Sequence, residues 1–128
     1  MFRTRYIPAI VWTLLIAVLS FLPGKDLPSV TIFQFDKFVH FVFYFIQYAL
    51  LAYAAGHDTG RGVRRVALPS QSVQYLLLIA TILFGFGIEV CQGAFTQDRI
   101  FDLYDGLANS IGAIGAFIVC GTVFSRAD

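Results

Sequence analysis

The sequence predicts an all-α membrane protein, a single domain over residues 1–128 that folds as a bundle of four transmembrane helices. Of its 128 residues, 58% are hydrophobic and 13% are charged, whereas a soluble domain carries about 25% charged residues. The apolar residues form four stretches of roughly 17–25 residues, the length that crosses a hydrocarbon core of about 30 Å. The sequence has no basic patch of the kind that binds nucleic acid. The long apolar stretches make the lipid bilayer the expected partner.

The first predicted helix covers about residues 6–22. Pro8 lies near its start, where a helix tolerates proline. Arg3 and Arg5 precede it as in a signal peptide, but Leu22 is followed by proline and glycine and not by a small-residue cleavage site. We therefore expect a retained helix.

The other three predicted helices cover about residues 38–55, 73–95 and 103–124. Prolines and glycines interrupt residues 23–35 and 56–72, and residues 96–101 are expected to form a tight turn. The last helix carries small residues at every fourth position, which lets another helix approach closely: Ala108, Gly112 and Ala116. Cys91 and Cys120 are expected about 20 Å apart along antiparallel helices, too far for a disulfide.

The basic residues predict the orientation. With the N-terminus inside the cell, six of the nine arginines and lysines fall on the cytoplasmic side: Arg3, Arg5, Arg61, Arg64, Arg65 and Arg126. The connections are short, and an excess of positive charge in short connections marks the cytoplasmic side. We therefore expect both termini in the cytoplasm.

Polar residues gather where the second helix begins, the third ends and the fourth begins, which is the outer end of the bundle in this orientation. On the second helix they share one face: Asp36, His40, Tyr44 and Gln47. Glu89 and Gln92 share a face of the third helix. The fourth helix contributes Asp102, Asp105 and Asn109. Carboxylates facing lipid are costly and normally turn into a bundle to find partners, so we expect one shared pocket.

Several of these residues also have a structural interpretation, and both interpretations stay open. Asp36 and Asp102 are well placed to cap the second and fourth helices, and Lys37 can snorkel to the headgroups. Gln47, Tyr44, Gln92 and Asn109 can form hydrogen bonds between helices. Glu89 and Asp105 are the hardest to explain structurally, and Glu89 lies roughly 9 Å inside its apolar segment.

Two blocks of residues resemble a known family. Residues 36–44 are similar to the D-K-x-x-H-F-x-x-Y motif of the VanZ-like family. A second block is similar to the E-x-x-Q and R-x-x-D-x-x-D-x-x-x-N-x-x-G patterns of that family, and consists of Glu89, Gln92, Arg99, Asp102, Asp105, Asn109, Gly112 and Gly115. The order and the spacing of the two blocks along the chain agree with the family pattern.

The resemblance implies a small protein of the bacterial cytoplasmic (inner) membrane. The namesake of the family is associated with resistance to the glycopeptide antibiotic teicoplanin. The resemblance defines no reaction and does not imply that this chain confers resistance.

The first functional hypothesis is an enzyme that acts at the outer leaflet on a lipid or a lipid-linked cell-envelope precursor. Glu89 and Asp105 are candidates for acid and base, and His40 for a proton shuttle. Lys37 and Arg99 are candidates for binding a phosphate. The other candidate substrate-binding residues are Asp36, Tyr44, Gln92, Asp102 and Asn109. Alternatively, carboxylates and histidine suit a divalent cation, with Asp36, His40, Glu89, Asp102 and Asp105 as candidate ligands.

Two further hypotheses remain. In the first, the protein is a non-enzymatic binding or accessory protein, and the cluster recognises a headgroup, a peptide, a drug or a partner protein. In the second, it is a small proton-coupled transporter, although the polar face of the second helix ends at Gln47. Assembly into an oligomer is compatible with each hypothesis.

Overall fold

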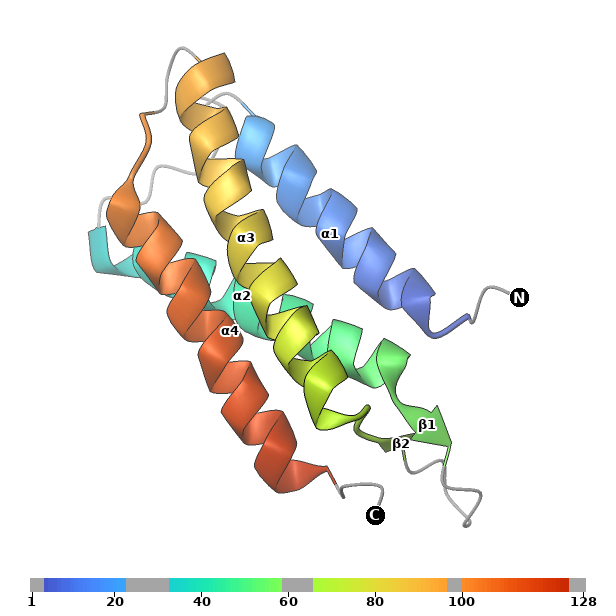
Figure 1. The fold of residues 1–128 in the computed structure, drawn as a ribbon. Coiled ribbons are helices and arrows are strands. Elements are labelled where there is room, and N and C mark those ends of the chain that lie inside the picture. Colours follow the sequence, from blue (N-terminus) through green and yellow to red (C-terminus); the bar gives the residue numbers. More distant parts are fainter. Residues whose placement is uncertain (1–3, 23–32, 59–65, 97–99, 125–128) are drawn as a thin grey trace.

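The computed structural model describes residues 4–22, 33–58, 66–96 and 100–124. Within these ranges the chain forms four helices and one short antiparallel hairpin (Figure 1). The elements are α1 (Tyr6–Phe21), α2 (Phe33–Ala55), β1 (His57–Asp58), β2 (Val66–Ala67), α3 (Gln71–Phe95) and α4 (Leu103–Val123). The hairpin lies between α2 and α3, and pairs His57 with Ala67 and Asp58 with Val66.

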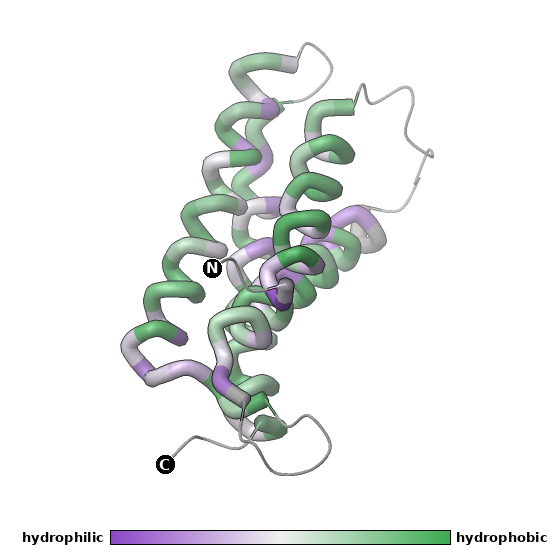
Figure 2. The backbone as a smooth tube through the Cα atoms, turned by 90° about the vertical axis from the view of Figure 1, so that its right-hand side faces the viewer, coloured by the Kyte–Doolittle hydropathy of each residue, from purple (hydrophilic) through white to green (hydrophobic). Residues whose placement is uncertain are grey.

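Three of these helices are long and apolar enough to cross a membrane: Asp36–Ala55 within α2, all of α3 and all of α4. The hydropathy colouring is green along most of each helix (Figure 2), and large apolar side chains such as Leu76, Leu83 and Ile111 face outward. Helix α1 is apolar but has 16 residues, which rise about 24 Å. The fold is therefore that of a helical membrane protein.

The helices agree with the sequence prediction apart from their ends. Helix α2 begins at Phe33, five residues before the predicted start. Asp36 consequently lies inside the first turn of α2, and its interpretation as the N-cap is wrong. The capping role of Asp102 is confirmed, since the Tyr104 backbone N–H donates to Asp102 Oδ1 at 2.8 Å.

The core is formed mainly between α2 and α4. A Cβ atom on Gly112 would collide with the carbonyl oxygen of Phe41, so the two backbones touch at this glycine. Further along the same face of α4, small residues pack against α2 in a buried cluster that contains Tyr48, Ala52, Leu68, Ala113, Ala116 and Cys120. The predicted close approach along α4 is confirmed at Gly112 and Ala116. Cys91 and Cys120 are free thiols, as expected.

Helix α1 is attached to the other helices by polar contacts as well as by packing. The Trp12 indole donates to the Phe43 carbonyl at 3.0 Å, and the Gln47 amide donates to the Thr13 hydroxyl at 2.8 Å. Gln47 therefore serves as an interhelical hydrogen-bonding residue.

Candidate functional site

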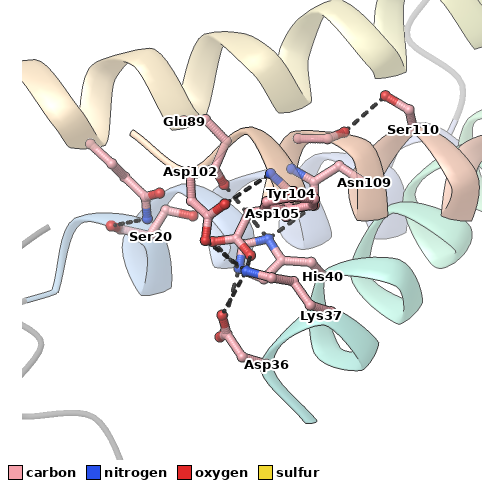
Figure 3. A network of polar contacts seen from close by, with 12 residues as sticks. Ser20, Asp36, Lys37, His40, Glu89, Asp102, Tyr104, Asp105, Asn109 and Ser110 are labelled. Atoms are coloured by element: carbon pink, nitrogen blue, oxygen red, sulfur yellow. Dashed lines mark hydrogen bonds and ion pairs between the residues drawn. The ribbon is translucent and has the colours of Figure 1, made fainter. Parts of the chain in front are cut away.

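Lys37 connects the beginning of α2 to the beginning of α4. Its Nζ donates to Asp102 Oδ2 at 2.8 Å and makes a second, shorter hydrogen bond to Asp105 Oδ1. Asp36 Oδ2 lies 3.7 Å from the same nitrogen. Lys37 thus turns toward carboxylates instead of snorkelling, and its charge is engaged within the site (Figure 3).

His40 lies one turn further along α2, and its two ring nitrogens have different surroundings. Nδ1 is 3.0 Å from Asn109 Oδ1. An amide oxygen only accepts hydrogen bonds, so this contact places the proton of the neutral ring on Nδ1. Nε2 is then left with its lone pair, and it lies 3.7 Å from Asp105 Oδ2 and 3.9 Å from Asp36 Oδ1. Asn109 therefore determines which nitrogen can accept a proton or bind a metal.

Glu89 approaches His40 from α3 and is 1% exposed. Its Oε1 lies 3.6 Å from His40 Nδ1 and has no hydrogen-bond partner among the described residues. The close packing around it depends on Gly85, one turn earlier on α3, because a Cβ there would meet Tyr44 Cε1 at 3.0 Å and Asn109 Cβ at 3.1 Å. A small residue on α3 thus lets α2 and α4 close over the glutamate.

A pocket of about 300 Å³ opens beside this network. It is lined by Asp36, His40, Gln92, Ile100, Phe101, Asp102 and Asp105. Polar side chains form one part of its wall and two apolar side chains another. Ile100 is 88% exposed, so the apolar part continues onto the surface of the molecule.

Asp102 has two roles where α4 begins, as the N-cap and as a partner of Lys37. The hydrogen bond from Lys37 lowers the pKa of its carboxyl group below the ordinary value, and the bond from the Tyr104 backbone N–H acts in the same direction. Asp102 is therefore held in its charged form beside the pocket.

The remaining predicted residues are placed as follows. The Gln92 amide lines the pocket but donates to the Ser20 carbonyl at 2.7 Å, so it joins α3 to α1. Tyr44 is buried, and its hydroxyl has no hydrogen-bond partner among the described residues. Arg99 lies outside the described residues.

Taken together, the structure brings Asp36, Lys37 and His40 of α2 into contact with Glu89 of α3 and with Asp102, Asp105 and Asn109 at the beginning of α4 (Figure 3). Sequence reasoning missed Ile100 and Phe101, which line the pocket. Only their position between Arg99 and Asp102 could have indicated a place in the site, since an apolar side chain does not by itself indicate a binding site.

Comparisons of this chain with protein-family models, with curated proteins and with solved structures found no match. The fold and the site by themselves define a class, a helical membrane protein with an acidic, histidine-containing pocket at one end of its helices.

Proposed function

We propose that this chain is a VanZ-like protein of the bacterial cytoplasmic membrane and that it acts as an enzyme on a lipid or lipid-linked cell-envelope precursor at the outer leaflet. The residues that carry the family resemblance support this proposal. Asp36, Lys37 and His40 of the first block contact Glu89, Asp102 and Asp105 of the second. Residues more than 40 positions apart in the sequence therefore belong to one site.

The observation that carries the enzymatic proposal is the orientation of His40. Asn109 holds its Nδ1, and Nε2 faces the pocket beside the carboxylates of Asp36 and Asp105. An imidazole with one nitrogen fixed and the other open to a pocket is arranged for proton transfer. In the proposed site His40 transfers the proton, and Glu89 and Asp105 stabilise the charged ring.

The composition of the pocket supports an amphiphilic ligand. Ile100 and Phe101 provide an apolar wall next to the carboxylates, and both residues lie just before the membrane-spanning α4. A lipid headgroup can contact the polar wall while its chain follows the apolar one. Lys37 is already paired with carboxylates, so the ligand is not expected to depend on it as a phosphate-binding residue.

The test is conversion of a lipid. The purified protein in nanodiscs is incubated with a total lipid extract from bacterial envelopes, and lipid masses are followed over time. The wild-type protein should deplete one species and produce a mass-shifted product, and His40→Gln and Glu89→Gln should not. His57→Gln is the matched control, because His57 lies in the hairpin at the other end of α2.

A binding or accessory protein is the second candidate, and the ion pairs of Lys37 favour it. Three carboxylates surround one ammonium group, and such an ion-pair network can line a binding pocket without taking part in a reaction. In that case a lipid should copurify with the protein and remain chemically unchanged in the same assay, and Glu89→Gln should retain it.

The proposed topology has four membrane spans with both termini in the cytoplasm, so the pocket faces outward. Single-cysteine variants test it after Cys91 and Cys120 have been replaced. A membrane-impermeant maleimide should label Tyr104→Cys in intact cells, because Tyr104 is exposed beside the pocket. It should label His57→Cys only after permeabilisation. The reverse pattern would overturn the proposed orientation.

A further inference from the structure

Three side chains direct one atom each toward a common space at the mouth of the pocket. The ligand atoms of Asp36, His40 and Asp105 all lie within 4.8 Å of one another. His40 Nε2 is 3.9 Å from Asp36 Oδ1 and 3.7 Å from Asp105 Oδ2. Two ligands of a tetrahedral metal ion, each about 2.1 Å from it, lie about 3.4 Å apart. Small side-chain movements therefore suffice to bind an ion.

The other polar atom of each of these side chains is already in contact with a different group. Asp105 Oδ1 accepts a hydrogen bond from Lys37, and Asp36 Oδ2 lies 3.7 Å from the same ammonium group. His40 Nδ1 donates to Asn109 Oδ1. Supporting contacts of this kind orient ligands around protein-bound metals and select the histidine tautomer that binds the ion.

Glu89 provides an independent indication of a missing positive charge. Its side chain is 1% exposed, and Oε1 points at His40 without a hydrogen-bond partner among the described residues (Figure 3). The described part of the site has the carboxylates of Asp36, Glu89, Asp102 and Asp105 around a single lysine. A buried carboxylate is costly without a compensating charge. Glu89 Oε1 faces His40 Nδ1, so a divalent cation bound to Nε2 would compensate it through the ring, as in the carboxylate–histidine pairs that support protein-bound metals.

We propose that Asp36, His40 and Asp105 bind one divalent cation, Zn²⁺ or Mn²⁺, whose remaining coordination position opens into the pocket. A nitrogen ligand favours these ions over Mg²⁺ and Ca²⁺, which prefer oxygen alone. Three protein ligands and one open position are typical of catalytic zinc sites. Two of the five ligand candidates from the sequence are left out of this site. Asp102 is bonded to Lys37, and Glu89 faces His40 Nδ1 and not Nε2.

The part of this inference that concerns the substrate rests on the proposed function. A cation in this position changes the chemical class of substrate that the acidic pocket accepts, because its open position binds an anionic oxygen, such as that of a phosphate group. With Nε2 bound to the cation, His40 would no longer transfer the proton itself, and a water molecule activated at the open position would supply that proton instead. The cation thus explains how a pocket lined by carboxylates can bind a phosphate-containing headgroup.

The test is metal binding by the full chain, purified in detergent without a polyhistidine tag and stripped with a chelator. Titration with Zn²⁺ and with Mn²⁺, followed by calorimetry and elemental analysis, should give one ion per chain for at least one of them. Asp105→Asn and His40→Gln should abolish binding. His57→Gln and Asp102→Asn should keep it, and Asn109→Ala should weaken it about 10–100-fold.

Cobalt substitution provides a measurement that does not depend on these variants folding. Co²⁺ bound to the wild-type protein should give visible d–d absorption of a site with mixed nitrogen and oxygen ligands, and excess Zn²⁺ should displace it. Failure of the wild-type protein to bind any of the three ions would overturn the inference, as would unchanged binding in folded His40→Gln. Metal binding without lipid conversion would refute only the proposed enzymatic function, and conversion by metal-free protein would refute only the cation.

Discussion

Asn109 on α4 accepts a hydrogen bond from His40 on α2, with 3.0 Å between Nδ1 and Oδ1. Asn109 is itself 1% exposed, and it lies where α2, α3 and α4 meet. The contact explains why an amide is needed at a buried position of a membrane helix, because it fixes the ring orientation and the tautomer of the histidine at the pocket.

The first prediction concerns this hydrogen bond. Asn109→Ala removes the acceptor, so the neutral His40 ring should populate both tautomers instead of the Nδ1–H form alone. The measurement is the ¹⁵N chemical shifts of metal-free protein labelled in histidine, with the exposed His57 as internal reference. Ser110→Ala on the same helix is the control and should leave the His40 shifts unchanged. A single Nδ1–H tautomer in Asn109→Ala would contradict the assignment.

Lys37 should stabilise the fold through its partners on α4. Lys37→Met leaves Asp102 and Asp105 without their counter-charge, and the free energy of unfolding should fall by about 1–3 kcal/mol. Adding Asp105→Asn removes one of the unpaired charges and should restore part of the loss. Reversible unfolding in mixed micelles measures both effects. Additive losses in the double variant would show that the two residues do not interact.

Asp102 predicts a pH dependence of stability. Its folded-state pKa is lowered by the hydrogen bond from Lys37, so the charged form stabilises the fold above the unfolded-state pKa of about 3.9. This contribution is lost as the pH falls through the lower folded-state value. Asp102→Asn keeps a good N-cap but removes the charge. The variant should be less stable than wild type near neutral pH, and the difference should disappear below the folded-state pKa. Reversible unfolding of both proteins in mixed micelles across the pH range measures this difference.

Gly112 should not tolerate a side chain. The Cβ of Gly112→Ala would collide with the Phe41 carbonyl, and overpacking of this kind costs typically about 1–3 kcal/mol. Gly121→Ala is the matched control on the same helix, because nothing lies within 4 Å of its added Cβ. Alanine there should stabilise α4 by up to about 1 kcal/mol. Equal stability of the two variants would refute the close contact between α2 and α4.

Gln92 is expected to contribute to the stability of the fold and not to metal binding. Its amide donates to the Ser20 carbonyl on α1, so Gln92→Leu should lower the free energy of unfolding by about 0.5–1.5 kcal/mol. Metal affinity should stay at the wild-type value, because Gln92 contributes none of the proposed ligands. A loss of metal binding in a folded Gln92→Leu protein would show that Gln92 takes part in binding the cation.

The sequence allowed the helices and most of the site residues to be predicted, but not how each residue is used. Asp36 and Asp102 both looked like helix caps, and only Asp102 caps. Gln47 and Gln92 shared faces with acidic residues, yet both hydrogen-bond to α1. Helical spacing determines which residues share a face, whereas a partner on another helix depends on how the helices cross.

The sequence alone was enough to predict a helical membrane protein, because long apolar segments require lipid around them and helices within them. It also determined that costly polar groups cluster at one end of those helices. The packing of the helices was needed to show that Lys37 pairs with Asp102 and Asp105 and that Asn109 orients His40. These contacts join residues more than 60 positions apart. They exist because Gly112 lets the backbones of α2 and α4 touch and because Gly85 on α3 leaves room for the side chains of Tyr44 and Asn109.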